Sequence, residues 1–530
     1  MGTPISRRTF LALGASIVVA ACSKSDDDVS DGDGSSDTTP STTASTTTTT
    51  STTLAPAPFD VDPFTLGVAS GDPSTTSVII WTRLAPDPLN GGGIAEEEVS
   101  VRWEVATDID FTDIVSFGDV MATARHGHSV HVEVSPPVGA MAYYRFRVGE
   151  FTSPVGATRV APDSSSMETV RIATASCQNY TAGYYTAYDD MVKQSPDLVV
   201  FLGDYIYEGG VGTLGATTVR LHNSEEITDL VMYRNRYALY RGDPLLQNAH
   251  AMCPWVVTWD DHEVENNYAG LTPQDAADVD GYAARRAAAY QAWWEHMPVR
   301  LEPPVDENLS IHRRVTWGGL VNMLVLDGRQ YRDDQACGDA VLQVTPACDE
   351  ASAAERTMLG AQQEAWVAEN IESDAVWSVL ANQTVMTDIR LGTAVLNYDQ
   401  WDGYAPARDR LLDSVSSAEN LVVLTGDIHL AGVGQLTVST DPGTARGVEF
   451  VTTSISSSGN IDSSTEALLV ALPNIIDAEV VHRGYTLHTI DAGSWTADYR
   501  IVDDALVEGS AVTTWKTFAV TAGSPAVTAV

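Results

Sequence analysis

Basic residues are scarce in this chain. Its 530 residues contain 30 Lys and Arg against 71 Asp and Glu, which gives a formal net charge of −41. Such a surface repels nucleic acids and anionic lipids, so nucleic-acid binding is excluded as a main role. The pattern GxxxxGK[ST] is absent too, and with it P-loop nucleotide chemistry. We interpret the acid first as a source of solubility, with part of it available to bind cations.

Cysteine is also rare, with five residues in the whole chain. Cys22 lies near the amino terminus, and Cys253, at the entrance of an apolar run, is predicted to be a small buried residue. Cys337 and Cys348 flank a loop-like stretch, and in an exported protein this arrangement predicts a disulfide. Cys177 is left without a structural role.

The first 22 residues are typical of an export leader. Arg7 and Arg8 precede an apolar stretch, Leu11 to Ala21, that is too short to span a bilayer as a mature helix. The paired arginines resemble a twin-arginine signal, which predicts export of an already folded protein. The ending VAAC resembles a lipobox with Cys22 as the lipidation site, and the alternative is an ordinary cleaved signal. We expect a cell-surface lipoprotein or a secreted protein.

The rest of the chain divides by pattern. Residues 23–57 are rich in Ser, Thr, Asp, Gly and Pro, which predicts a disordered linker. Residues 58–160 hold short alternating runs between turns, which predict an N-terminal all-β sandwich domain. Over residues 168–505 apolar runs alternate with helical stretches, which predicts an α/β domain. Residues 506–530 are predicted to be a tail with an edge strand.

The apolar runs of the α/β domain each end in a polar side chain. The runs TASC, FLGD, TWDD, LVLD and LTGD supply Cys177, Asp204, Asp260 with Asp261, Asp327 and Asp427. In α/β sheets, ligands gather beyond the carboxyl ends of the strands. A single aspartate at such a place is equally well a helix cap, but repetition of the pattern predicts a shared site.

Donors of two kinds occur at these strand ends. Carboxylates suit Ca²⁺, Mg²⁺ or Mn²⁺, whereas thiolate, phenolate and imidazole favour a transition metal. Tyr207 follows Asp204 closely, and His429 follows Asp427. The mixed set predicts two neighbouring metal ions that share an acid, an arrangement that clamps the attacking and leaving oxygens of phosphoryl transfer.

Five motifs together resemble the PhoD family of alkaline phosphatases. They are SCQ at 176–178, FLGDYIYE at 201–208, WDDHEVENNY at 259–268, LDGRQYR at 326–332 and TGDIHLAG at 425–432. That family belongs to the calcineurin-like metallophosphoesterases and is related to the purple acid phosphatases. The resemblance spans about residues 60–500. It implies an α/β, or α+β, fold: a four-layer β-sandwich flanked by helices, with an N-terminal domain of immunoglobulin or fibronectin type.

The resemblance also implies the cofactors, one Fe³⁺ and one or two Ca²⁺. The iron ligands it implies are Cys177, Asp204, Tyr207 and His429. Asp204 is expected to bridge to calcium, and Asp427 to complete the calcium side. The second aspartate there is Asp260 or Asp261, and the choice of inner ligand stays open.

Catalytic roles follow from the same resemblance. His262 is expected to support the leaving group or the transition state, and Asn267, with Asn266, to hold phosphate or a second calcium. Arg329 is expected to bind phosphate, and an ion pair with Asp327 is the alternative.

The implied activity is hydrolysis of phosphomonoesters, and of diesters as well, by a metal-bound hydroxide. Small phosphate esters are the expected partners, and the membrane is reached only through a lipid anchor. One alternative is a phosphodiesterase or phospholipase D-like enzyme, in which Trp401 and Tyr404 either stack on a nucleoside or only pack. The other is a surface lipoprotein that binds phosphate or calcium without catalysis. The sequence does not set the oligomeric state.

Overall fold

The computed structural model describes residues 57–530 except 211–217, 275–278, 306, 339–346 and 460–462. They belong to one compact unit, Leu54–Val530. The predicted leader with Cys22, and the linker as far as residue 56, lie outside the described residues. Within the described ranges, no helix has both the length and the apolar character that crossing a membrane requires.

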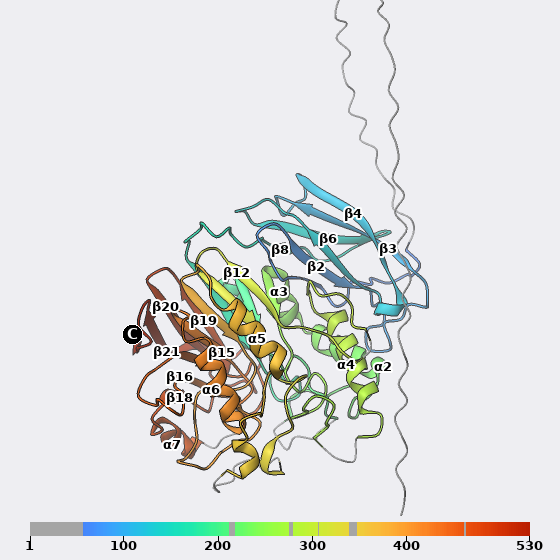
Figure 1. The fold of residues 1–530 in the computed structure, drawn as a ribbon. Coiled ribbons are helices and arrows are strands. Elements are labelled where there is room, and N and C mark those ends of the chain that lie inside the picture. The colour runs from blue at the N-terminus through green and yellow to red at the C-terminus, as the bar shows by residue number, and fades with distance from the viewer. Residues whose placement is uncertain (1–56, 211–217, 275–278, 306, 339–346, 460–462) are drawn as a thin grey trace, which may run out of the picture. The chain divides into compact units, whose positions relative to one another are not determined.

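Two large sheets form the centre of the fold (Figure 1). The first has ten strands in the order β22 (Val527–Ala529), β21 (Val512–Thr521), β20 (Ser494–Val502), β19 (Arg483–Ile490), β9 (Val170–Ala175), β10 (Leu198–Phe201), β11 (Pro254–Val257), β1 (Val68–Gly71), β2 (Val78–Arg83) and β5 (Ser129–Val134). The second has seven, in the order β12 (Arg313–Trp317), β13 (Val321–Val325), β14 (Trp377–Ala381), β15 (Leu421–Thr425), β17 (Gly447–Val451), β16 (Ala431–Leu436) and β18 (Ile475–Glu479).

The central strands β10 and β15 are buried on both faces, as their continuous Val- and Leu-rich runs predict. One hydrophobic cluster joins Ile172 and Val200 of the first sheet to Val379 and Leu424 of the second, so the two sheets pack face to face. Parallel pairs form the middle of each sheet, among them β9–β10–β11 and β13–β14–β15–β17.

Helices cover the outer faces. On the first sheet they are α1 (Thr186–Gln194), α2 (Leu230–Arg241), α3 (Pro244–Met252) and α4 (Tyr282–His296). On the second they are α5 (Gly360–Asn370) and α6 (Ala405–Ser414), with the short α7 (Glu466–Val470) beside β18. The result is the expected four-layer sandwich of helices, sheet, sheet and helices (Figure 1).

The N-terminal all-β region is a sandwich with one shared layer. Its own sheet contains β4 (Ile114–Ala122), β3 (Val99–Ala106), β6 (Ala142–Val148), β7 (Phe151–Thr152) and β8 (Gly156–Thr158). The opposite layer is β1, β2 and β5, and one apolar cluster fills the space between the layers. Because β1 pairs in parallel with β11, that layer also continues the ten-stranded sheet.

Strand pairing therefore crosses both predicted domain boundaries. Ser70 of β1 lies opposite Pro254 of β11, across the predicted boundary between residues 160 and 168. At the other end, the segment predicted as a tail contains β21, which pairs with β20 over most of its length. Both pairings join segments that lie far apart in the sequence, so the sequence pattern alone assigns these segments to separate units.

Candidate metal centre

The candidate residues lie where parallel strands of both sheets end. Directly after β9, β10, β11 and β15 the chain places Cys177, Asp204, Asp260, Asp261 and Asp427. A parallel bridge between Ser176 and Ser454 joins the ends of β9 and β17, and so connects the two sheets at this edge. The strand-end pattern of the sequence thus becomes one cluster in space.

Several of these residues have a left-handed backbone. The φ angle is 56° at Cys177, 59° at Asp204, 65° at Asp427 and 56° at His429. Such conformations cost a non-glycine residue about 1–3 kcal/mol each, so surrounding contacts must hold them. Gly203 is needed for a different reason: a Cβ there would lie only 2.5 Å from the Cβ of Asp260.

We call Cys177, Asp204, Tyr207 and His429 the thiol–phenol group. One ligand atom each of Cys177, Asp204 and His429 lies within 4.8 Å of the others, and all three residues are buried. The Tyr207 hydroxyl donates to Asp204 Oδ2 at 2.7 Å and lies 3.1 Å from His429 Nε2. Thiol, carboxyl, phenol and imidazole thus converge on one point, as a transition-metal site requires.

Ionisation within the thiol–phenol group is unfavourable without a cation. Burial, and after it the charges of neighbouring acids, raise the pKa values of Cys177, Asp204 and Tyr207 well above their ordinary ranges. Burial also lowers the pKa of His429 to about 3, so its imidazole is neutral, the form that binds metals. A bound cation would lower the pKa values of Cys177, Asp204 and Tyr207 and so favour their ionised forms.

We call Asp260, Asp261 and Asp427 the carboxylate group. One carboxylate oxygen of each lies within 4.8 Å of the others. A further set of Asp204, Asp261 and His262 meets the same limit, so Asp261 belongs to two sets and links the carboxylate group to Asp204. Of the adjacent pair, Asp261 belongs to two of these sets and Asp260 to one, so Asp261 would be the inner ligand of a bound ion.

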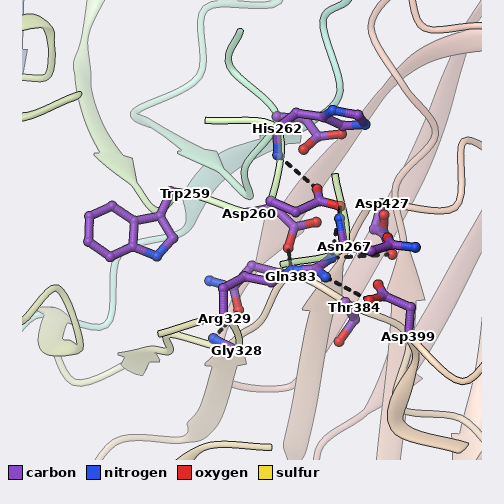
Figure 2. A network of polar contacts seen from close by, with 12 residues as sticks. Trp259, Asp260, His262, Asn267, Gly328, Arg329, Gln383, Thr384, Asp399 and Asp427 are labelled. Atoms are coloured by element: carbon purple, nitrogen blue, oxygen red, sulfur yellow. Dashed lines mark hydrogen bonds and ion pairs between the residues drawn. The ribbon is translucent and has the colours of Figure 1, made fainter. Parts of the chain in front are cut away.

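A guanidinium lies within the carboxylate group (Figure 2). Arg329 is fully buried; its Nε donates to Asp260 Oδ1 and its Nη1 donates to Asp399 Oδ1 at 2.8 Å. Its Nη2 lies 3.7 Å from Asp261 Oδ2 and 3.9 Å from Asp427 Oδ2. The proposed pair with Asp327 is not the one formed, since the Asp327 carboxylate instead accepts the backbone N–H of Arg329 at 3.1 Å.

The three carboxylates differ in pKa because they are held differently. Burial raises the pKa of Asp260 well above its usual range, and that of Asp427 to about 6. Against the same burial, Arg329 and His262 lower the pKa of Asp261. Asp261 also accepts the backbone N–H groups of His262 at 2.9 Å and Asn267 at 2.7 Å.

His262 is oriented by a carboxylate absent from the sequence prediction. Its Nδ1 lies 2.7 Å from Glu208 Oε2, and its ring packs 4.1 Å from that of Tyr207 between centroids. Although burial opposes it, Glu208 and Asp204 raise the pKa of His262 well above the ordinary value. A protonated imidazole held beside anionic ligands is suited to give a proton to a leaving oxygen.

Asn267 lies beside this histidine in a fixed backbone position. Its φ angle is 54°, and its carbonyl oxygen accepts Arg332 Nη2 at 2.9 Å and Gln335 Nε2 at 2.6 Å. Its backbone is thus held in place, and Figure 2 shows Asn267 beside Asp427. Asn266 differs, because its amide donates to Gln274 at 2.5 Å.

The residues present fit metal ions. Asp204 Oδ1 and Asp260 Oδ2 are enclosed by protein, and neither has a hydrogen-bond partner within the described parts of the chain. Unpaired buried carboxylate oxygens are costly, and such charges are normally paired or bound to a metal. The donors also differ in chemistry: thiol, imidazole and phenol surround Asp204, whereas Asp260, Asp261 and Asp427 form a set of carboxylates alone.

The remaining candidates are less central. Trp401 and Tyr404 are buried, 1% and 0% exposed, so they pack in the core under α6 rather than offer a face to a nucleoside. Cys337 and Cys348 form a disulfide with a Cα–Cα distance of 5.8 Å. Cys253 is a free, buried cysteine, as expected.

Sequence reasoning missed several polar residues around the ligands. Glu208 lies inside the quoted motif FLGDYIYE, so its position next to Tyr207 was an available signal. Asp399, Gln400 and Ser457 come from other loops, and only the fold brings them to Arg329, Asp427 and Tyr207.

Comparison with known proteins finds matches along most of the chain. The family model for PhoD-like phosphatase matches residues 172–499, and the model for the N-terminal domain of PhoD-like phosphatases matches residues 48–162. Alkaline phosphatase D of Bacillus subtilis (strain 168) is 45% identical over 476 residues, which cover 87% of this chain and 81% of that protein.

Two solved structures are similar as well. A structure of PhoD has a TM-score of 0.85 and 44% identity, and the match covers 89% of this chain and 93% of that one. Purple acid phosphatase PPD1 from yellow lupin seeds has a TM-score of 0.52 over 86% of this chain and 73% of its own. At 10% identity the lupin enzyme shows likeness of fold alone.

Proposed function

The chain belongs to the PhoD-like phosphatase family and is a phosphoric ester hydrolase, and we propose that it works through an Fe³⁺/Ca²⁺ centre outside the cytoplasm. Its substrates are small phosphomonoesters, with diesters accepted as well. The observation that carries the proposal is the pair of adjacent donor groups linked through Asp204 and Asp261.

The two groups match two different ions. The thiol–phenol group would hold Fe³⁺, because thiolate and phenolate are anionic donors suited to a highly charged transition metal. The carboxylate group, with Asp204 shared, would hold one or two Ca²⁺, which prefer oxygen ligands. When bound, such ions polarise the phosphoryl group and lower the pKa of water.

The surrounding residues supply orientation and a proton. Glu208 fixes Nδ1 of His262 and thereby leaves Nε2 for the leaving oxygen of the ester. Asn267, with its backbone held by Arg332 and Gln335, presents an amide that can donate to a phosphate oxygen. Arg329 acts from within the protein: it is fully buried and balances the charge of the carboxylate group rather than contacting solvent.

Export completes the proposal. The twin-arginine leader carries folded proteins, so the iron would enter the thiol–phenol group before export and Ca²⁺ would join outside. Lipidation of Cys22 would then keep the enzyme at the cell surface on its Ser/Thr-rich linker. Mass spectrometry of the mature amino terminus tests this, because an unmodified Cys22 would contradict the anchor.

The enzymatic proposal is tested with paired chromogenic mono- and diester phosphates between pH 5 and 11, with chelator and with added Ca²⁺. Monoester turnover that chelation abolishes and Ca²⁺ restores is expected. Turnover of diesters alone would show that the enzyme is a phosphodiesterase rather than a phosphomonoesterase. If neither ester is hydrolysed although iron and calcium are bound, the chain is the non-catalytic binding protein.

A further inference from the structure

Ser457 touches two members of the thiol–phenol group, although it is not itself a metal ligand. Its Oγ lies 2.8 Å from the Tyr207 oxygen and 2.7 Å from the Cys177 carbonyl oxygen, and either of them can accept its hydrogen. The same Oγ accepts the backbone N–H of Asn179 at 3.0 Å. The residue is buried, 1% exposed, so water does not compete for these bonds.

The hydroxyl carries one hydrogen but lies between two acceptors. Because Asn179 fills one of its acceptor positions, the Ser457 proton points either to Cys177 or to Tyr207. While Tyr207 is a phenol, its own proton serves Asp204 at 2.7 Å. Once the phenol loses that proton to become a ligand, its oxygen is the stronger acceptor, since hydrogen bonds to charged groups are the stronger ones.

Ser457 also helps to hold the strained backbone of Cys177. That residue has a φ of 56°, and its carbonyl oxygen accepts the backbone N–H of Ser457 at 3.2 Å as well as the hydroxyl. The side chain thus connects the conformation of one ligand to the oxygen of another.

We propose that Ser457 is a positioning residue that donates a hydrogen bond to Tyr207 in its phenolate form and so limits how strongly that oxygen donates electrons to the metal. The inference rests on the proposed function, because it requires a transition metal at Tyr207. Hydrogen bonds to ligand atoms are a general means of tuning a bound metal.

The neighbouring serine provides a matched control. Ser456 is equally buried, 1% exposed, and its Oγ donates to the Asn179 carbonyl oxygen at 2.9 Å, not to Tyr207. Ser456→Ala therefore removes a buried hydroxyl from the same strip of chain and leaves the Ser457–Tyr207 contact in place.

The test uses the iron-loaded full chain and two readouts, iron content and the visible absorption band that an Fe³⁺ phenolate gives. Wild type, S456A and S457T are expected to share one absorption maximum, because each keeps the Ser457 hydroxyl or its equivalent. S457A is expected to keep its iron and to shift the maximum to longer wavelength, since the free phenolate gives up an electron more easily.

The outcomes separate this inference from the proposed function. An iron-bound S457A with an unchanged maximum overturns the role of Ser457 and leaves the phosphatase proposal intact. A wild-type chain that binds iron without a visible band removes Tyr207 as a ligand, and with it this inference. If S457A does not fold, S457C replaces it: a thiol is a weaker donor, so a shift in the same direction supports the role and an unchanged maximum overturns it.

Discussion

The thiol–phenol group and the carboxylate group lie side by side, but they are balanced in different ways. Arg329 lies within the carboxylate group, bonded to Asp260 and close to Asp261. In the thiol–phenol group, the guanidinium of Arg483 bonds instead to the backbone oxygen of His429. Among the contacts of the described residues, no guanidinium bonds to a ligand atom of that group.

This difference indicates which half depends on its ion. Arg329 and His262 lower the pKa of Asp261 in spite of burial, so this carboxylate keeps its charge without a metal. The carboxylate group is thus partly compensated in the protein alone. Thiol, phenol and carboxyl groups without such a partner stay protonated until a cation arrives, and metal binding must then release protons. The carboxylate group is therefore preformed electrostatically, and the thiol–phenol group is completed by its metal.

Asp204→Asn should affect both groups, because Asp204 belongs to the thiol–phenol group and also lies next to Asp261 of the carboxylate group. Metal ions contribute several kcal/mol to phosphoryl transfer, and each 1.36 kcal/mol is a factor of ten. We expect a loss of about a thousandfold in kcat/KM, together with loss of both ions from the purified protein. Asp190→Asn, at a distant pair with Arg500, is the control and should retain both. A variant that loses activity but keeps both ions would refute the shared role.

Arg329→Met tests the internal charge of the carboxylate half. Removing one partner of a buried ion pair destabilises a protein by about 3–5 kcal/mol. The free energy of unfolding measured with chelator should fall by that amount, and Ca²⁺ should restore part of it by replacing the lost cation. Arg410→Met, at a partly exposed pair with Glu364, provides the control. Equal stability of variant and wild type in chelator would contradict the view that Arg329 balances this half.

Cys177→Ser and Asp427→Asn should separate the halves. Changes around metal ligands cost about 10–100-fold in metal affinity, and loss of a ligand costs at least as much. The serine variant should lose iron and keep calcium, and the asparagine variant should do the reverse. Elemental analysis after gel filtration reads both in one experiment. Parallel loss of both metals in each variant would show one indivisible site.

Glu208→Gln should have a smaller effect, because Glu208 belongs to neither metal-binding group and acts on His262. The carboxylate raises the pKa of His262, so its loss lowers that pKa and deprotonates the imidazole at lower pH. If protonated His262 serves the leaving group, the basic limb of the pH–rate profile moves to lower pH and kcat falls about 10–100-fold. Glu226→Gln, at a half-exposed pair with Arg285, is the control. An unshifted basic limb would remove His262 as the acid.

The strand-end pattern correctly predicted that these side chains gather at one edge of the sheets, because the pattern is local. Each ligand follows its strand within a few residues, and parallel pairing then brings the ends together without further information. The alternation of apolar runs and helical stretches predicted an α/β domain for a similar reason, since doubly buried strands require covering helices. The four-layer arrangement followed from the family resemblance.

Contacts between distant loops could not be predicted in this way. Asp399 meets Arg329, and Ser457 meets Tyr207, across 70 and 250 residues of sequence. A loop aspartate or serine does not indicate which distant residue it will contact, because most polar loop residues face solvent. Likewise, nothing in the sequence of β1 says that it pairs with β11 as well as with β2 of its own sandwich.

The order of strands in the first sheet has a consequence for the timing of synthesis. β9, which leads to Cys177, lies between β10 and β19, and Thr174 of β9 meets His488 of β19 across 314 residues of chain. A ribosome must therefore release nearly the whole polypeptide before this strand gains its second neighbour. Long-range pairing of this kind is slow, so the site is assembled by the finished chain and not piece by piece. If the chain crossed a membrane unfolded, its metal site could form only after translocation was complete.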